Sequence, residues 1–68
     1  MPDSRPMPSI DGACHELRIL GGDHSWRIVY AIETDAIVIL EVFSKKTGRT
    51  PQRVIEVCRR RLKEYRNA

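Results

Sequence analysis

The hydrophobic pattern of this chain changes its period once, across residues 43–51. Before this segment, apolar side chains recur largely at every second position, which is typical of β-strands with two distinct faces. After it, they recur three and four positions apart, which is typical of an amphipathic helix. A chain with this order of patterns folds as strands followed by a helix, so the sequence predicts an α+β fold.

Three segments carry the strand pattern. Residues 14–20 alternate, and residues 25–33 are rich in aromatic and β-branched side chains. Residues 36–43 are almost wholly apolar, which favours a central strand covered on both faces. The Gly-rich segment 21–24 and the dipeptide Thr34-Asp35 are expected to be turns.

The termini of the chain differ in character. Residues 1–13 contain three of the four prolines, so we expect an extended or disordered segment there. Thr50 is a good N-cap and Pro51 a good first helical residue. The helix that follows should end near Tyr65 or Arg66, with an apolar stripe formed by Val54, Ile55, Cys58, Leu62 and Tyr65. The sequence thus predicts a small antiparallel three-stranded sheet followed by one C-terminal amphipathic helix, in a single domain over residues 14–66.

One helix can cover only one face of such a sheet. We expect it to cover the face of the bulkiest side chains, so that Trp26 and Tyr30 lie in the core. The other face, with Val29 and Ala31, then has no cover within the chain, and this favours a homodimer or a partner chain. A chain of 68 residues also buries only about 60% of its unfolded surface, which makes it marginal alone.

Charge is distributed unevenly along the chain. From Ser44 onward there are nine basic and two acidic residues, a net charge of +7, whereas residues 1–43 carry a net charge of −4. A basic third of this kind is the electrostatic signature of a surface that meets a polyanion. No segment has the length and hydrophobicity of a membrane span or a secretory signal, so we expect a cytoplasmic protein without membrane contact.

Metal and thiol chemistry receive little support from the residue spacing. Cys14 and Cys58 are far apart and form no CxxC motif, so two small buried thiols are expected rather than a disulfide. The two histidines have no cysteine or carboxylate at ligand spacing, so the sequence predicts neither a metal site nor a cofactor. His15 shares its strand face with Leu17 and Ile19, which favours a satisfied, partly buried histidine over a catalytic one.

Strand alternation places Arg18 and Arg27 on one sheet face, beside the basic segment that contains Lys45 and Lys46. Guanidinium and ammonium groups arranged in this way suit a phosphate. The alternative is that Arg18 pairs with Glu16 or Glu33 as an ordinary surface ion pair, and composition alone favours it. On the helix, basic side chains such as Arg53, Arg60 and Lys63 could follow a phosphate backbone or only solvate the outer face.

Five segments together resemble the RelE/HigB-type toxins of phage origin, which are the toxin halves of bacterial type II toxin–antitoxin modules. The segments are His15-Glu16-Leu17-Arg18-Ile19, Trp26-Arg27-Ile28-Val29-Tyr30, Phe43-Ser44-Lys45-Lys46-Thr47, Thr50-Pro51 and Arg61-Leu62-Lys63-Glu64-Tyr65. The resemblance covers residues 7–66. It implies an endoribonuclease that cleaves mRNA in the ribosomal decoding site and is inhibited by a helix-turn-helix antitoxin.

The resemblance also implies roles for individual residues. Arg18 and Arg27 match the sheet arginines that contact the scissile phosphate, and Lys45 and Lys46 match the basic residues of the strand-to-helix junction. We expect metal-independent catalysis by these four residues, and RNA binding by Arg49, Arg53, Arg60 and Lys63. Family members begin with a further strand and two helices, so we expect an N-terminally truncated toxin. Its alternative function is a catalytically inactive module that dimerises or binds an antitoxin.

Overall fold

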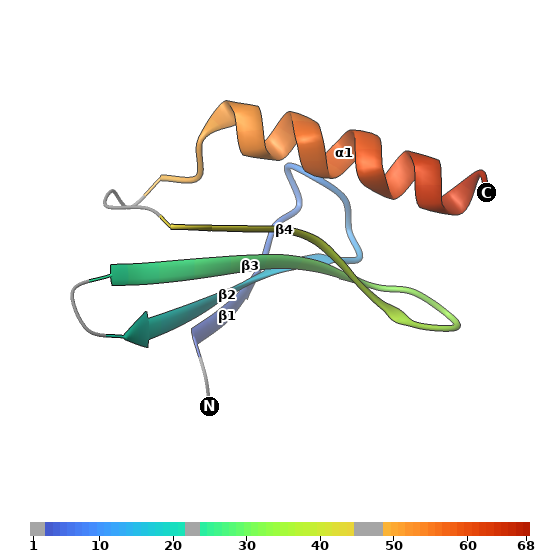
Figure 1. Ribbon diagram of the computed structural model, residues 1–68. Helices are drawn as coiled ribbons and strands as arrows, with labels where there is room; N and C mark the ends of the chain where they lie inside the picture. Colours follow the sequence, from blue (N-terminus) through green and yellow to red (C-terminus); the bar gives the residue numbers. More distant parts are fainter. Residues whose placement is uncertain (1–2, 22–23, 45–48) are drawn as a thin grey trace.

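The computed structural model of the protein describes residues 3–21, 24–44 and 49–68. Its elements follow one another as β1 (Asp3–Pro6), β2 (Cys14–Gly21), β3 (His24–Ile32), β4 (Ile37–Ser44) and α1 (Gln52–Arg66). Figure 1 shows the strands in one layer, with α1 lying along one side of it. The predicted α+β fold, an antiparallel sheet followed by one C-terminal helix, is confirmed.

The sheet has four strands where the sequence predicted three. Its order is β1-β2-β3-β4, and every neighbouring pair is antiparallel. The additional strand β1 lies inside the segment predicted to be extended or disordered, and it pairs Ser4 with Leu17 and Pro6 with His15. Because β1 is an edge strand, Pro6 can stand in it although it has no backbone N–H to donate.

The prediction that residues 36–43 form a fully covered central strand is wrong. β4 is the other edge of the sheet, and Ile37, Ile39 and Val42 on one of its faces are exposed. Its register against β3 shifts by one residue at Leu40, since Val29 pairs with Glu41 while Tyr30 pairs with Ile39. The carbonyl oxygen of Leu40 accepts a hydrogen bond of 2.7 Å from Arg61 Nη1 on α1. This contact joins the helix to the bulge of the edge strand.

Helix α1 begins at Gln52, one residue later than the predicted first helical residue, Pro51. Pro51 is the N-cap residue and no side chain caps the first turn, so the role predicted for Thr50 is wrong. The Thr50 hydroxyl instead donates a 2.7 Å hydrogen bond to Oε2 of Glu16 on β2. The helix ends at Arg66, as expected, and the predicted apolar stripe buries Val54, Cys58 and Leu62.

The helix covers the sheet face opposite to the one we expected. Val29 and Ala31 are completely buried beneath it, together with Cys14, whereas Trp26 on the other face remains 44% exposed. Glu16 shares the face of Cys14 and binds Thr50, so the residue just before the helix is held on that side. The segment between β1 and β2 closes the same core with Met7 and Ile10, and Figure 1 shows it rising from the sheet toward α1.

Tyr30 and His15 lie side by side on the uncovered face and are half-buried rather than part of the core. Their rings stack with centroids 5.5 Å apart, and the Tyr30 hydroxyl lies 2.7 Å from Ser4 Oγ on β1. His15 is partly buried, as predicted. Its Nδ1 atom, however, is buried without a hydrogen-bond partner among the described residues, so the expectation of a satisfied histidine is wrong.

Candidate functional site

The two strand arginines of the candidate site are direct neighbours in the sheet. Arg18 on β2 pairs in register with Arg27 on β3, and Arg27 in turn pairs with Phe43 on β4. Both arginines therefore lie on the face that carries α1, toward the end of the sheet where β4 leads into the strand-to-helix junction. Strand alternation predicted this shared face correctly.

The two guanidinium groups have different surroundings. Arg18 is exposed, whereas Arg27 is only 8% exposed. Arg27 donates a hydrogen bond through Nη1 to Ser25 Oγ, and its Nε lies 3.7 Å from Glu16 Oε1. The protein thus holds Arg27 in one place with a carboxylate and a hydroxyl, while the neighbouring Arg18 side chain is exposed.

Glu16 is the residue at this site that sequence reasoning missed. It is 2% exposed, yet its carboxylate binds groups from several parts of the chain. Besides Arg27, it accepts a 2.7 Å hydrogen bond from Thr50 and one of 3.3 Å from Arg5 Nη2 on β1. A buried carboxylate is tolerated when it is paired in this way. Here its partners come from β1, from β3 and from Thr50 just ahead of α1. Its signal in the sequence was a carboxylate on the same strand face as Cys14.

Of the predicted basic residues that follow β4 in the sequence, the structure describes only some. Lys45 and Lys46, predicted to act in catalysis, lie outside the described residues. Arg49 is exposed and immediately precedes Thr50, whose hydroxyl is bound to Glu16. The structure therefore brings Arg49 to the same end of the sheet as the strand arginines.

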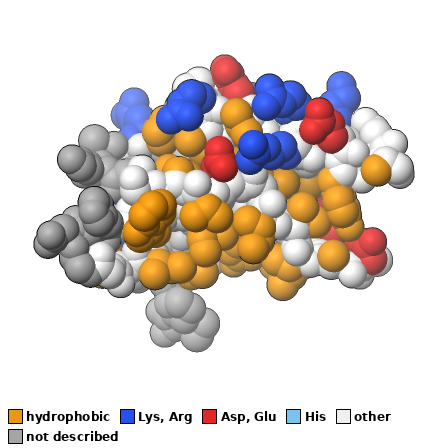
Figure 2. Space-filling view, in the orientation of Figure 1, with side chains coloured by type: hydrophobic (Ala, Val, Ile, Leu, Met, Phe, Trp, Pro, Cys, Tyr) orange, Lys and Arg blue, Asp and Glu red, His pale blue; other side chains and the backbone are white. Residues whose placement is uncertain are grey.

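Helix α1 presents a second group of basic side chains. Arg53, Arg60 and Lys63 are exposed, and within the residues that the structure describes they form no hydrogen bond or ion pair. Figure 2 shows Lys and Arg side chains in a band over α1, above the hydrophobic side chains of the strands. These three residues lie along the helix, on an element other than the strands that carry Arg18 and Arg27.

The remaining helix arginines have structural contacts. Arg59 binds the backbone oxygen of Ser9, with Nε at 2.9 Å, and Arg61 binds Glu41 at 3.2 Å. Arg66 forms paired hydrogen bonds with the carboxylates of Glu33 at 2.8 Å and Asp11 at 3.1 Å. Glu33 was one of the two residues considered as an ion-pair partner of Arg18, and the structure pairs it with Arg66.

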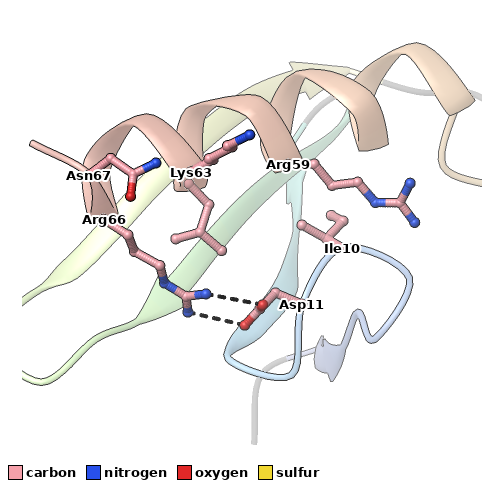
Figure 3. Close-up of a pocket in the computed structure, with 7 residues that line it drawn as sticks. Ile10, Asp11, Arg59, Lys63, Arg66 and Asn67 are labelled. Carbon is pink, nitrogen blue, oxygen red and sulfur yellow. Dashed lines mark hydrogen bonds and ion pairs between the residues drawn. The ribbon is translucent and has the colours of Figure 1, made fainter.

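An open pocket of about 340 Å³ lies beneath the C-terminal half of α1, against the segment between β1 and β2. Figure 3 shows Arg66 and Asp11 joined across it, with Ile10 and Lys63 at its walls. Hydrogen bonds from Arg66 lower the pKa of the Asp11 and Glu33 carboxyls. Arg66 is thus already neutralised by two carboxylates, whereas Lys63 in the wall of this pocket forms no ion pair among the described residues.

The cysteines belong to the core and not to any site. Cys14 and Cys58 are both buried free thiols, as predicted, and burial raises the pKa of each to about 11. Within the described ranges, no three His, Cys, Asp or Glu side chains come together as a metal would require. No helix in the described part of the chain has the length and hydrophobicity to cross a membrane.

The sequence of the chain matches a protein-family model over residues 1–63, nearly its whole length. The family is described as "Phage derived protein Gp49-like (DUF891)". Comparisons with curated proteins and with solved structures give no significant match.

Proposed function

The chain belongs to the Gp49-like family of phage-derived proteins, a RelE/toxin-like family, and from this we propose that it is the toxin of a toxin–antitoxin module. The proposed activity is metal-independent cleavage of mRNA, with the ribosome positioning the substrate. A helix-turn-helix antitoxin is the proposed inhibitor. The antitoxin would mask the basic end of the sheet and so prevent RNA from reaching it.

The observation that supports this proposal most strongly is the pairing of Arg18 with Arg27 across β2 and β3. Like charges directly opposite each other in a sheet are destabilising, and here the carboxylate of Glu16 lies 3.7 Å from Arg27 Nε and offsets part of that cost. Two neighbouring guanidinium groups on one sheet face would suit a phosphate group, which can accept hydrogen bonds from the exposed side chain of Arg18. Sites that work against local stability are those where function is expected.

The proposed chemistry is an attack of the ribose 2′-OH on the adjacent phosphate. A bond forms between the 2′-oxygen and phosphorus, and the bond from phosphorus to the 5′-oxygen breaks, which gives a 2′,3′-cyclic phosphate and a 5′-hydroxyl. Arg18 would stabilise the charge that develops on the phosphoryl oxygens. Lys45 or Lys46 would take the proton of the 2′-OH, and the other would supply one to the leaving 5′-oxygen.

The surroundings of Arg27 assign it a supporting part in this scheme. Its guanidinium is held by Glu16 and Ser25, so it would orient Arg18 and add positive potential beneath the phosphate. Arg49 and the helix residues Arg53, Arg60 and Lys63 would bind the flanking phosphates of the RNA. Contacts of this kind give affinity without sequence selectivity and weaken as salt concentration rises.

A second candidate function is a catalytically inactive toxin-like module that retains antitoxin binding. The burial of Arg27 favours it, because an arginine that is 8% exposed and paired with a carboxylate is less available to a substrate. The two candidates differ in one property that can be measured directly, which is whether the protein alone cleaves RNA in the cell.

Induced expression in a bacterial host separates the two candidates. The proposed toxin should arrest growth and produce mRNA fragments with 5′-hydroxyl ends, and Arg18→Ala should lower cleavage about 10²–10³-fold, as expected for the loss of a charge-stabilising donor. Glu64→Ala, which changes an exposed helix residue outside the site, is the control matched for expression level. Full toxicity of a folded Arg18→Ala protein would contradict the assignment of this residue. Harmless expression of the unaltered chain, with antitoxin binding retained, would favour the inactive module.

A further inference from the structure

The sheet face opposite α1 is apolar across three strands. Its apolar and aromatic residues alternate along β2 and β3 and continue on β4 across the bulge: His15, Leu17, Ile19, Trp26, Ile28, Tyr30, Ile32, Ile37, Ile39 and Val42. Ile37 and Ile39 are 67% and 62% exposed, and none of the ten residues is an acid, a lysine or an arginine. We call this surface the open face. Figure 2 shows hydrophobic side chains gathered over the strands below α1.

The open face is as large as a small protein–protein interface requires. Three strands about 4.8 Å apart, each about eight residues long at 3.3 Å per residue, give a flat footprint of roughly 370 Å². Protruding side chains raise its accessible area to roughly 600 Å², which is at the upper end of what a typical monomer leaves in one apolar patch. Two such faces together bury about 1,200 Å², the lower limit for a specific and stable complex.

We propose that the open face is the interface of a homodimer, in which the sheets of two copies pack face to face. A twofold axis brings the same surface, which has no acid, lysine or arginine, from each copy together. No such charge is desolvated, and no like charges face each other across the interface. Sheets pack in this way about 10 Å apart, with strands aligned to within about 30°. The result is a layered particle in the order helix, sheet, sheet, helix.

The width of the open face favours a second sheet over a partner helix. A helix with its side chains is about 10–12 Å wide, and it binds best in a groove. The open face spans three strands, roughly 14 Å, and a helix would leave part of it in water. A second copy presents a sheet of equal width and covers all three strands. Chains of this length also commonly gain stability by association.

Dimerisation through the open face leaves the proposed RNA site accessible. Arg18, Arg27 and the basic face of α1 all lie on the other side of the sheet, so the dimer carries two such sites on its outer surfaces. The interface proposal does not depend on cleavage activity, because the oligomeric state is measured without RNA. Failure of one proposal therefore leaves the other standing.

The first test is sedimentation equilibrium of the full chain from about 1 to 100 µM, together with two lysine variants. We expect a dimer for the unaltered protein and for Leu20→Lys, because Leu20 is 69% exposed but lies on the face of Arg18. Ile39→Lys places a charge on the open face and should give a monomer over the same range. A monomeric unaltered chain, a dimeric Ile39→Lys protein or an assembly larger than a dimer would overturn the proposal.

The second test needs no variant and so does not depend on how a substitution affects folding. Trp26 is the single tryptophan of the chain and lies on the open face. Dilution through the dissociation range should therefore expose its indole and shift its fluorescence emission to longer wavelength. An emission maximum that stays constant while the dimer dissociates would place the interface elsewhere. A chain that is monomeric throughout, and whose emission changes only when antitoxin is added, would assign the open face to that partner instead.

Discussion

Both faces of the sheet carry apolar side chains, but they differ in which polar groups lie among them. The face under α1 has small buried side chains, Cys14, Val29 and Ala31, and it surrounds the ion pair of Glu16 and Arg27. The open face has larger side chains and no charged group. Hydrophobic burial is non-directional, so apolar content alone does not decide which face the helix covers. The polar contact of Glu16 with Thr50 is directional, and it marks the face on which α1 begins.

The largest effect in this comparison is expected from Glu16→Ala. This change leaves Arg27 buried without its carboxylate and frees the Thr50 hydroxyl, and removal of one partner of a buried ion pair costs about 3–5 kcal/mol. Such a loss is comparable to the whole stability of a domain of this size. We therefore expect urea denaturation to show a protein that is largely unfolded even without denaturant.

Two variants test whether this loss comes from the buried charge. Thr50→Val keeps the shape of the side chain and removes only its hydrogen bond to Glu16, so about 1.5–3 kcal/mol should be lost. Glu64→Ala removes an exposed carboxylate from α1 and should change stability by less than about 0.5 kcal/mol. If Glu16→Ala unfolds at the same urea concentration as Glu64→Ala, Glu16 does not anchor the covered face.

The second prediction compares equivalent truncations on the two faces. Leu62→Ala removes a side chain that is 3% exposed under α1 and should lower the free energy of unfolding by about 2–5 kcal/mol. Ile37→Ala on the open face should cost less than about 0.5 kcal/mol when the chain is dilute enough to be monomeric. Chemical denaturation at two protein concentrations measures both values.

Protein concentration then sharpens the comparison. If the open face is a dimer interface, the cost of Ile37→Ala should grow as concentration rises, because the dimer stabilises the folded chain by mass action. The cost of Leu62→Ala should stay constant, since that side chain packs within one copy. Equal and concentration-independent costs for the two variants would show that the two faces do not differ in this way.

Much of the fold could be predicted because strand and helix periods are local properties of the sequence. The alternation in residues 14–20 and 25–33 gave strand limits within one residue of β2 and β3. Strand β1 was missed because the three prolines of residues 1–13 argue against pairing, and only the edge position, which is a tertiary property, makes Pro6 acceptable. The covered face was assigned wrongly, since both faces are apolar and side-chain size does not decide between them.

The candidate site, like the fold, could be predicted only where a local sequence pattern decides. Parity placed Arg18 and Arg27 on one face, and the register makes them direct neighbours. Parity could not reveal that Arg27 is buried and held by Glu16, because the burial of a strand residue depends on where the helix lies. Glu16 itself shares its strand face with Arg18, which is also the pattern of an ordinary surface ion pair. Its partner Thr50 is 34 positions away in the sequence, which no local pattern connects.

The smallest expected effect concerns acid stability at the end of the covered face, where Arg66 binds Asp11 and Glu33. Hydrogen bonds from Arg66 hold the pKa of both carboxyls below their ordinary values of 3.8 and 4.5. A carboxyl with a lowered pKa in the folded state stabilises the fold above its unfolded pKa, and this contribution is lost as pH falls through the folded value. Stability should therefore be constant from pH 7 to about 5 and decline below about 4.5.

Arg66→Gln tests the origin of this decline. Without the guanidinium, both carboxyls should titrate nearer their ordinary values, and the melting temperature should depend less on pH in the acid range. Arg60→Gln removes the same charge from an exposed position without a partner among the described residues, so its acid profile should follow that of the unaltered chain. Because these groups are exposed to solvent, the change should be smaller than either core effect. If both glutamine variants show the same acid profile, the decline reflects the overall charge of the chain and not the contact that joins α1 to the segment preceding β2.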